Sequence, residues 1–359
     1  MSVTRETVLE ALKEIQLPEG GDLSSSDMIK ALTVNSGSVS FILEVAGDKG
    51  AAMAPVRDRA QAAIESIDGV QKVSVILTAH SDAGESAPQD PPPNLQIGAH
   101  PKPQKGPKEI PGVKHVISIA SGKGGVGKST VASNLAVALA RQGQRVGLLD
   151  ADIYGPSQHR MMGLNEKPQS PNGKTIVPLE NHGVKFMSMG LLLEEDEAVV
   201  WRGPMLVGTL QQLVGQTEWG ELDVLIVDLP PGTGDVQLSM SQNTVQTGAI
   251  VVSTPQDVAL LDARKALNMF GKTRTPVLGM IENMSTHICS NCGHEEHVFG
   301  HGGAREEAAK LDLTFFGEIP LDMKIRLASD QGSPVALGND ALADAYGDIA
   351  EALIADVLT

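Results

Sequence analysis

A glycine-rich segment between an apolar run and a helical pattern constrains this chain more than any other feature. Residues 121–130 have the sequence SGKGGVGKST, which matches the phosphate-loop pattern G-x-x-x-x-G-K-S/T. Residues 115–120 before it have the composition of a strand, and residues 132–142 after it have the apolar spacing of a helix. The glycines let backbone N–H groups approach phosphate oxygens, and a helix N-terminus attracts anions. The segment therefore predicts a nucleotide-binding loop between a strand and a helix.

Individual positions in this loop have distinct expected roles. Lys128 is expected to reach the β- and γ-phosphates and to act in catalysis, and Ser129 is expected to ligate Mg²⁺ through its hydroxyl. The residues expected to contact the nucleotide are Gly122, Gly124, Gly125, Val126, Gly127, Lys128, Ser129 and Thr130.

Acidic residues follow two further apolar runs, where parallel strands open onto a ligand crevice. Asp152 is expected to orient the attacking water and to contact Mg²⁺ through water, whereas Asp150 is expected to be structural. Asp228 ends the run at 224–227 and is expected to hold the Mg²⁺ shell. No glutamate follows Asp228, so slow hydrolysis is expected. Residues 230–235 (PPGTGD) are expected to form a rigid switch loop that senses the γ-phosphate.

Short, continuous, β-branched apolar runs alternate with helical stretches over the C-terminal part of the chain. The runs are 116–120, 146–149, 224–227, 250–252 and 277–281. Such runs indicate parallel strands covered on both faces, and the spacing at 129–142 and 258–270 places helices between them. The pattern predicts a doubly wound, mostly parallel α/β sheet of the P-loop NTPase type.

A proline-rich stretch separates this part from a small N-terminal segment. Residues 83–112 contain eight prolines mixed with Gly, Gln and Lys, a composition typical of a semi-extended linker. In the N-terminal segment, helical spacing at 7–15 and 57–67 and alternation at 39–45 and 73–77 predict a small α+β domain. The expected division is an α+β domain, a linker and a nucleotide-binding domain, at 1–82, 83–112 and 113–359.

Several short motifs together resemble a known family. They are SGKGGVGKST, LLDADIYGPS, WRGPM, DVLIVDLPPGTGD, IENMS followed by CSNCG, and FGEIPLD. Their combination resembles the deviant-Walker P-loop ATPases, which include the nitrogenase iron protein, the arsenite-pump ATPase, and the cell-division and partition ATPases. Within that family the chain is most similar to the Mrp/ApbC iron–sulfur cluster carriers, from about residue 110 to the C-terminus. The resemblance implies ATP, Mg²⁺ and a homodimer.

The resemblance also implies roles for residues outside the general phosphate-loop pattern. Lys123, the early lysine of the deviant loop, resembles a catalytic lysine that reaches across a dimer to the partner's nucleotide and stabilises charge on the transferring phosphate. Asn283 resembles the residue that reads the adenine, with Pro320 and Asp322 near the base.

The N-terminal segment resembles the small MIP18-like domain that is often fused to these carriers. Family members usually have a cysteine before the second helix, whereas residues 51–55 here have the sequence AAMAP. The domain therefore offers no thiol, and we expect it to dock a partner rather than to bind a metal or a cluster.

The two cysteines of the chain form a C-x-x-C pair, Cys289 and Cys292. Thiolates are soft ligands that suit iron–sulfur clusters or zinc. Two ligands leave a four-thiolate site half complete, whereas two copies across a two-fold axis complete it. The expected ligand is therefore an iron–sulfur cluster shared across a dimer, and the family implies the 4Fe–4S type.

Zinc is the main alternative for the cysteine pair, because histidines crowd the same segment. They are His287, His294, His297 and His301. The two cysteines and two of these histidines could close a tetrahedral site within one chain, although the interval from Cys292 to His294 is short for a zinc finger. A redox dithiol and a pair of inert cysteines are the remaining interpretations.

The net charge distinguishes between two candidate functions, a cluster carrier and a positioning ATPase that binds DNA or membrane as it cycles. The formal net charge of −16 opposes binding to phosphate backbones and anionic lipids. The helical pattern at 340–359 holds five acids and no base, unlike a basic membrane-binding helix. An electron-donating reductase like the nitrogenase iron protein would need cysteines at two separated places, and this chain has them at one.

These patterns lead to one predicted function. No stretch approaches the ~18 apolar residues of a membrane span, and residues 1–16 lack the apolar core of a signal peptide. We therefore predict a cytoplasmic ATPase that takes up an iron–sulfur cluster at a dimer interface and passes it to apoproteins, without nucleic acid or membrane as partners. The alternative is a positioning ATPase similar to the cell-division and partition ATPases, with a structural zinc or an inert cysteine pair.

Overall fold

The computed structural model of the chain describes residues 5–13, 15, 17, 22–24, 26, 28–35, 38–46, 50–67, 70, 72–80, 106–192 and 203–359. The chain divides into two structural units, residues 1–89 and 90–359.

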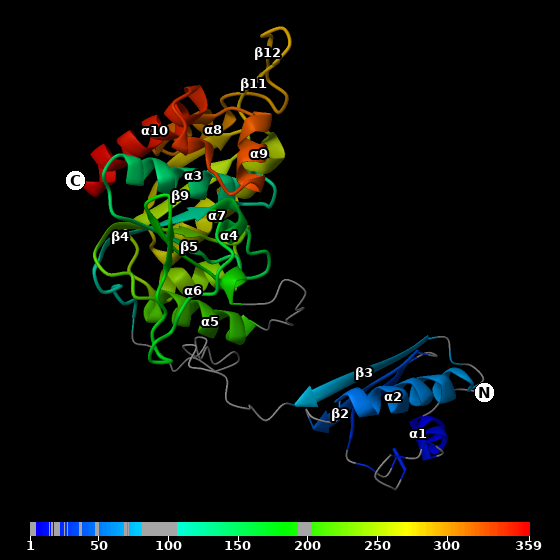
Figure 1. Ribbon diagram of the computed structural model, residues 1–359. Helices are drawn as coiled ribbons and strands as arrows, with labels where there is room; N and C mark the ends of the chain where they lie inside the picture. The colour runs from blue at the N-terminus through cyan, green and yellow to red at the C-terminus, as the bar shows by residue number, and fades with distance from the viewer. Residues whose placement is uncertain are drawn as a thin grey trace. The chain divides into compact units, whose positions relative to one another are not determined.

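The N-terminal unit packs two helices on a three-stranded sheet (Figure 1). Its elements are α1 (Arg5–Lys13), β1 (Ile29–Asn35), β2 (Ser38–Ala46), α2 (Gly50–Glu65) and β3 (Lys72–His80). β1 pairs antiparallel with β2, and β2 pairs parallel with β3. The alternating residues Val39, Phe41 and Leu43 of β2 are buried in the core of this unit, as expected of a half-buried strand.

The sequence patterns predicted both helices and the strands β2 and β3 of this unit but missed β1. A register shift between Lys30 and Thr33 interrupts the strict alternation by which a strand is recognised in a sequence. The second helix begins at Gly50 rather than at residue 57, so residues 51–55 lie within the helix and not before it.

The second unit is built on an eight-stranded sheet with the spatial order β13–β10–β9–β4–β8–β5–β7–β6. Its strands are β4 (Val113–Ala120), β5 (Val146–Asp150), β6 (Leu179–Asn181), β7 (Val184–Ser188), β8 (Leu222–Asp228), β9 (Gly248–Ser253), β10 (Val277–Asn283) and β13 (Thr314–Ile319). Neighbouring strands are parallel except for β6 and β7 at one edge. This confirms the predicted doubly wound, mostly parallel sheet.

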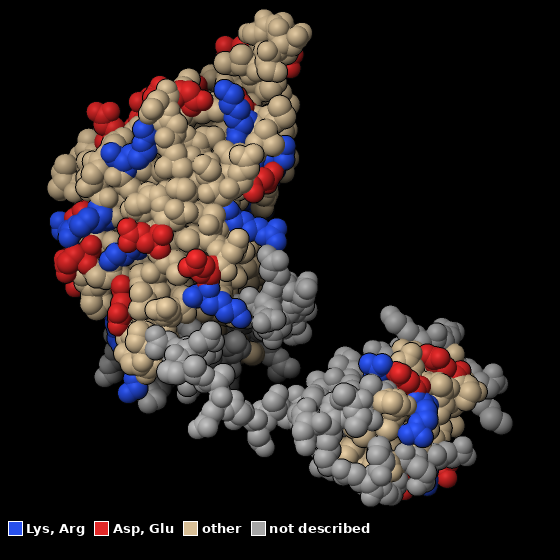
Figure 2. Space-filling model, viewed as in Figure 1, with Lys and Arg blue, Asp and Glu red and all other residues tan. Residues whose placement is uncertain are grey.

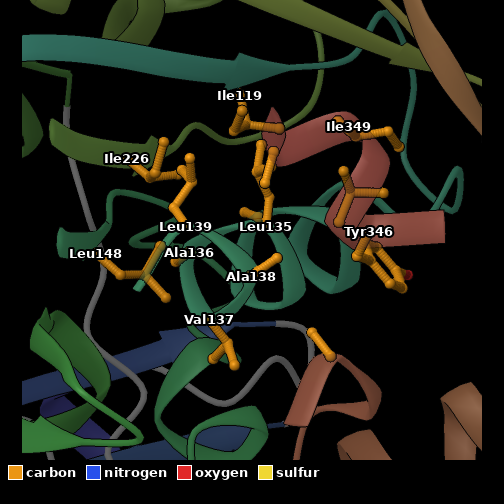
Figure 3. Packing of buried hydrophobic residues seen from close by; sticks show 14 of the residues in the cluster. Ile119, Leu135, Ala136, Val137, Ala138, Leu139, Leu148, Ile226, Tyr346 and Ile349 are labelled. Carbon is orange, nitrogen blue, oxygen red and sulfur yellow. The ribbon is translucent and has the colours of Figure 1, made fainter. Parts of the chain in front are cut away.

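Helices cover both faces of this sheet (Figure 1). They are α3 (Lys128–Arg141), α4 (Gln158–Met161), α5 (Gly203–Gln216), α6 (Asp235–Asn243), α7 (Asp257–Thr273), α8 (Gly303–Lys310), α9 (Met323–Asp330) and α10 (Ala341–Leu353). On β8, Ile226 packs in the cluster that contains α3 and α10 (Figure 3), whereas Leu225 and Val227 pack in the cluster that contains α5, α6 and α7. Because both faces are buried, the central strands are continuous apolar runs in the sequence.

Three strands of this sheet escaped the sequence patterns: β6, which has only three residues, and β7 and β13, whose apolar runs are interrupted. In β7 (VKFMS), Lys185 interrupts the apolar run, and its Nζ donates to the Trp219 carbonyl at 2.7 Å. In β13 (TFFGEI), Gly317 and Glu318 shorten the run, and the pairing with β10 shifts register between Met280 and Ile281. β7 and β13 are therefore specified by their neighbouring strands in the sheet more than by the local pattern of apolar residues.

The predicted linker is described only at its C-terminal end. Residues 83–105 lie outside the described residues, as do Trp201 and Arg202 of the motif WRGPM. Lys108 is part of the second unit, in which its N–H donates to the Asn243 carbonyl at 3.0 Å and its carbonyl accepts from the Val245 N–H at 2.9 Å. The predicted C-terminal helix is confirmed as α10, and no helix of the described residues is long and apolar enough to cross a membrane.

Tyr346 on α10 is fully buried (Figure 3), and its hydroxyl has no hydrogen-bond partner within the described part of the chain. Burial raises the pKa of this phenol, and the hydroxyl receives no compensation for its lost hydration. Tyr346→Phe is therefore expected to raise the free energy of unfolding by about 1 kcal/mol, which corresponds to about 2 °C in melting temperature.

Differential scanning calorimetry of the full chain measures this change. Tyr346→Ala is the contrasting variant, because it opens a cavity and should lower stability by about 3 kcal/mol or more. A phenylalanine variant that melts below the wild type would show that the hydroxyl is stabilised where it lies.

Candidate functional site

The phosphate loop joins β4 to α3 at the edge of the sheet where the parallel strands end. Gly125 and Gly127 have φ values of 84° and 79°, a region that disfavours any side chain. A Cβ on Gly127 would lie 2.2 Å from Asn283 Nδ2, whereas a Cβ on Gly125 would meet nothing within 4 Å. Gly127 therefore permits close packing of the loop, and Gly125 presents open backbone that phosphate oxygens can approach.

The first half of the loop lies against α7 and the predicted switch segment. A Cβ on Gly122 would lie 2.1 Å from the Asp262 carbonyl oxygen of α7, and a Cβ on Gly124 would lie 3.8 Å from Pro231. Lys123 is half-buried, and its Nζ lies 3.4 Å from Oε1 of Gln256, the residue that precedes α7. The Lys123 ammonium is thus held at the start of α7 and does not join the charged groups around Lys128.

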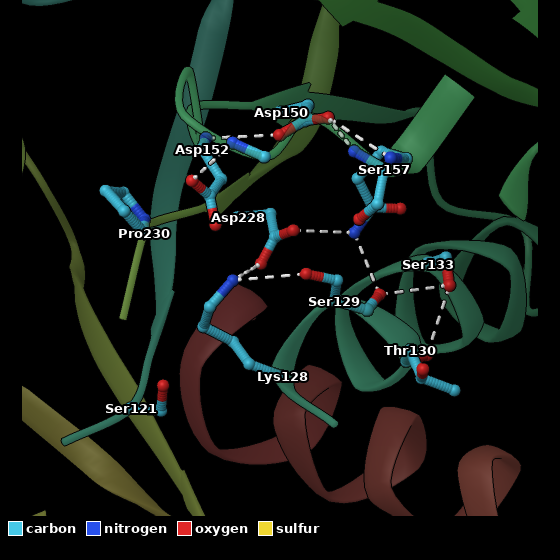
Figure 4. Close-up of polar contacts among 12 residues, drawn as sticks. Ser121, Lys128, Ser129, Thr130, Ser133, Asp150, Asp152, Ser157, Asp228 and Pro230 are labelled. Carbon is cyan, nitrogen blue, oxygen red and sulfur yellow. Dashed lines mark hydrogen bonds and ion pairs between the residues drawn. The ribbon is translucent and has the colours of Figure 1, made fainter. Parts of the chain in front are cut away.

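Lys128 and Ser129 open α3, and Lys128 is almost fully buried. The Lys128 ammonium forms an ion pair with the carboxylate of Asp228 at the end of β8, and it lies 3.2 Å from Ser129 Oγ (Figure 4). Thr130 follows in the same turn, and its carbonyl accepts from Ser133 Oγ at 3.1 Å. The structure therefore brings together the three side chains predicted to bind phosphate and Mg²⁺.

Asp150 lies beside Asp228, because the parallel register of β5 and β8 pairs the two residues directly. It is fully buried, and its Oδ2 accepts from the backbone N–H groups of Ser157 and Gln158 at 3.1 Å each and from Ser188 Oγ at 3.0 Å (Figure 4). Burial, followed by the nearby charge of Asp228, raises the pKa of Asp150 to about 7. Asp150 thus ties the loop after β5 to the sheet, in keeping with the structural role expected for it.

Asp152 is only half-buried and lies on the loop that Asp150 holds. Burial raises the pKa of Asp152, an effect opposed by the charge of Lys128, and its Oδ1 accepts from the Gly155 N–H at 3.3 Å. A cavity of about 590 Å³ is lined by Asp152, Tyr154 and residues of the predicted switch segment 230–235. The structure therefore places Asp152 opposite the segment expected to sense the γ-phosphate.

Two buried glutamines belong to this site and were not predicted from the sequence. Gln158 Nε2 donates to the Ser129 carbonyl at 2.8 Å and to Asp228 Oδ2 at 2.9 Å. Gln237 Nε2 donates to the Pro230 carbonyl at 2.6 Å and so holds the switch segment. Glutamine is mostly a surface residue, and no spacing in the sequence distinguishes these two. Their contacts are with residues distant in the chain and become visible only in the fold.

The residues assigned to the adenine lie at the ends of β10 and β13. Asn283 is buried, and its Nδ2 donates to the Val126 carbonyl at 2.8 Å, which ties the end of β10 to the phosphate loop. Pro320 follows β13, and Asp322 caps α9 by accepting from the Lys324 N–H at 2.7 Å. The three predicted residues thus lie at the edge of the sheet that carries the phosphate loop.

Cys289 and Cys292 lie in the turn of a small hairpin formed by β11 (His287–Ile288) and β12 (Glu295–Glu296). Figure 1 shows this hairpin projecting from the body of the second unit, beyond α8 and α9. Cys289 is half-buried, Cys292 is exposed, and neither forms a disulfide. Backbone N–H groups of Asn291 and Cys292, in that order, hold the pKa of the Cys289 thiol below its usual range.

Three of the four histidines near the cysteines contact groups other than the thiols. His287 Nδ1 lies 3.0 Å from the Leu321 carbonyl oxygen, and the rings of His297 and His301 stack with centroids 4.6 Å apart. Across the described residues, no group of three or more His, Cys, Asp or Glu side chains could hold a metal ion. The zinc interpretation therefore finds no four-ligand set within one chain here.

The charged side chains of the second unit are mixed in sign on the face shown in Figure 2, where Asp and Glu lie among Lys and Arg. The segment 285–301, which includes the hairpin, contains no lysine or arginine.

Models of two protein families match the two units. A model of the ParA family, described as NUBPL iron-transfer P-loop NTPase, matches residues 112–354. A second model, described as iron–sulfur cluster assembly protein, matches residues 5–75.

Individual relatives agree with these matches. The chain is 48% identical over 297 residues to the iron–sulfur cluster carrier protein of Pseudomonas fragi, which covers 81% of this chain and 96% of that protein. It is 40% identical over 349 residues to the iron–sulfur cluster carrier protein of Synechocystis sp., which covers 96% of this chain and 94% of that protein.

Solved structures share the fold of the second unit. The nucleotide-binding protein of Archaeoglobus fulgidus in complex with ADP is 40% identical with a TM-score of 0.57, over 64% of this chain and 91% of that chain. The cell division protein MinD of Aquifex aeolicus shares the fold at 22% identity and a TM-score of 0.50, over 67% of this chain and 98% of that chain.

The hydrogen bonds at Cys289 predict an unusually reactive thiol, because the thiolate is the form that attacks alkylating agents. In a metal-free Cys292→Ser variant, iodoacetamide is expected to alkylate Cys289. The pH at which this rate is half-maximal should lie below the value of about 8.5 that is typical of a free thiol. Serine retains a hydroxyl at position 292. Mass spectrometry over a pH series measures the rate, and the Cys289→Ser variant reports Cys292 for comparison. A midpoint for Cys289 at or above the typical value would contradict the stabilised thiolate.

Proposed function

The chain belongs to the ParA family of NUBPL iron-transfer P-loop NTPases, and on this premise we propose that it is an ATP-dependent carrier of iron–sulfur clusters. The observation that carries the proposal is the position of Cys289 and Cys292 on a projecting hairpin that follows Asn283, a residue in contact with the phosphate loop. The cluster is cargo, which the carrier binds and passes to apoproteins.

The phosphate loop supports ATP and Mg²⁺ as ligands of the second unit. Mg²⁺ prefers oxygen ligands, and the Ser129 hydroxyl and the Asp228 carboxylate both contact the Lys128 ammonium, so the donor set fits this ion. When bound, Mg²⁺ neutralises charge on the β- and γ-phosphates. Lys128 binds phosphate oxygens, and Asp152 orients the attacking water. Because Leu229 and not a glutamate follows Asp228, hydrolysis is slow.

Two copies of the chain complete both sites. Each hairpin supplies two thiols, and a cluster of the 4Fe–4S type takes four, so the cluster bridges a homodimer. Lys123 serves the partner's nucleotide: its ammonium contacts Gln256 instead of the charged groups of its own site, and a cation added from a partner stabilises the transferring phosphate. The lowered pKa of Cys289 supports cluster binding, because the thiolate is the ligating form.

The remaining parts of the chain support delivery of the cluster. We propose an α+β domain, a linker and an ATPase domain at 1–82, 83–112 and 113–359. The N-terminal domain docks recipients, which agrees with its match to a cluster-assembly family and with the absence of cysteine from its sequence. A reducing compartment such as the cytoplasm keeps Cys289 and Cys292 available as ligands.

Anaerobic reconstitution with iron and sulfide tests the cluster site. The wild type is expected to gain a broad brown absorbance with about one cluster per dimer, because four thiolates from two chains complete the site. Metal analysis, visible absorbance and mass in solution measure the result. The Cys289→Ala/Cys292→Ala variant should stay colourless.

The matched control replaces a serine near the cysteines and leaves both thiols in place. Ser290→Ala, between the two cysteines, should bind the cluster as the wild type does. A colourless wild type that retains one zinc ion per chain would leave a P-loop ATPase of unknown client and would end the carrier proposal.

The two lysines of the loop are expected to separate nucleotide binding from hydrolysis. Lys128→Ala should lose ATP turnover, and Lys128→Arg, which keeps the charge beside Asp228, guards against a loss that is due to misfolding. Lys123→Ala should retain ATP binding but hydrolyse on the order of 10³-fold more slowly if it acts as a charge-stabilising finger. Phosphate release and calorimetric titration measure the two quantities, with the exposed Lys272→Ala as control. Equal loss of binding and hydrolysis in Lys123→Ala would remove the finger role.

A further inference from the structure

One glutamine side chain bridges the two residues assigned to Mg²⁺. Gln158 is the first residue of α4 and is fully buried. Its Nε2 group donates one hydrogen bond to the Ser129 carbonyl at 2.8 Å and one to Asp228 Oδ2 at 2.9 Å. An amide NH₂ group has two hydrogens, and both are used here. A single group therefore joins the start of α3 to the end of β8.

The backbone that carries this side chain is fixed by Asp150. Asp150 Oδ2 accepts the N–H groups of Ser157 and Gln158, both at 3.1 Å, so the first residue of α4 is tied to the end of β5. The register of β5 and β8 places Asp150 directly beside Asp228. Gln158 therefore reaches Asp228 from a position that the same pair of strands defines.

Packing alone does not account for a glutamine at this position. Gln158 Oε1 is buried and has no hydrogen-bond partner among the residues that the structure describes. Leaving such an acceptor unpaired is unfavourable, because the group loses its hydration without a compensating hydrogen bond. A methionine or a leucine would fill the space without that cost, so the NH₂ group that touches Ser129 and Asp228 is the part that distinguishes glutamine.

We propose that Gln158 is a positioning residue for Mg²⁺, which sets the separation of Ser129 from Asp228 and fixes the orientation of the Asp228 carboxylate. With Oδ2 held by Gln158, Oδ1 faces the Lys128 ammonium, where the phosphates and the metal bind. A neutral amide satisfies one oxygen and leaves the negative charge of Asp228 for Mg²⁺. Partners that orient metal-binding groups in this way are worth about 10–100-fold in metal affinity.

This inference rests on the proposed binding of nucleotide with Mg²⁺, and its test uses the full chain with ADP as the probe. Gln158→Met keeps the length of the side chain without its hydrogen-bond donors. Gln158→Leu also removes the donors, with a shorter and branched side chain. Isothermal titration calorimetry measures ADP affinity in EDTA and across a Mg²⁺ series. We expect a rise of about tenfold or more in the Mg²⁺ midpoint, the Mg²⁺ concentration that gives half of the maximal change in ADP affinity. ADP affinity in EDTA should stay within about twofold of the wild type, because the phosphate loop itself is intact.

Gln246→Leu is the matched control. Gln246 is a partly buried glutamine of the second unit, and its Oε1 accepts from Ser118 Oγ at 2.5 Å, away from Ser129 and Asp228. Its Mg²⁺ midpoint should equal that of the wild type. Melting temperatures of all variants show that each is folded.

Three results would overturn the inference. The first is an unchanged Mg²⁺ midpoint in either folded Gln158 variant. The second is an equal loss of ADP affinity with and without Mg²⁺, which would assign Gln158 to the general architecture of the loop. The third is a wild type whose ADP affinity does not respond to Mg²⁺, which would remove the proposed Mg²⁺ site itself. This result distinguishes a failure of the Mg²⁺ site from a failure of the role of Gln158.

Discussion

The ion pair between Lys128 and Asp228 is the interaction on which the arrangement of the site depends. Both side chains are buried, and taking each charge out of water costs several kcal/mol. Their attraction offsets that cost because the remaining groups are also paired: Ser129 Oγ lies 3.2 Å from the ammonium, and Gln158 donates to the second carboxylate oxygen. These contacts exist only because β4, β8 and β5 are adjacent and end at the same edge of the sheet.

The same edge holds more negative than positive charge. Asp150 and Asp228 are neighbours in the register of β5 and β8, and both are fully buried. The Lys128 ammonium is a positive charge that acts on both carboxyl groups. Burial is the main reason that the pKa of Asp150 is raised, and the negative charge of Asp228 adds to the rise. A divalent cation would balance this charge, in keeping with the Mg²⁺ that we propose at the oxygen donors Ser129 and Asp228.

The sequence predicts those residues of the site that belong to short motifs with a characteristic spacing. The phosphate loop, Asp150, Asp152 and Asp228 follow from short motifs, because a strand that ends in a polar residue at the sheet edge leaves a clear pattern. Gln158 leaves none, since its role comes from contacts with Ser129 and Asp228 across the fold. Strands β1, β7 and β13 escaped for a related reason: a register shift, a lysine and a glycine disturb their patterns, and neighbouring strands specify them instead.

The cysteine hairpin is anchored at both of its ends beside Asn283. At the outgoing end, Ser285 N–H donates to the Ile319 carbonyl at 3.0 Å. At the returning end, Glu282 accepts the N–H groups of Gly302 and Ala304 at 2.8 and 2.7 Å. Asn283 itself holds the Val126 carbonyl of the phosphate loop. The contacts at both ends of the hairpin therefore lie next to Asn283, the residue that links β10 to the phosphate loop.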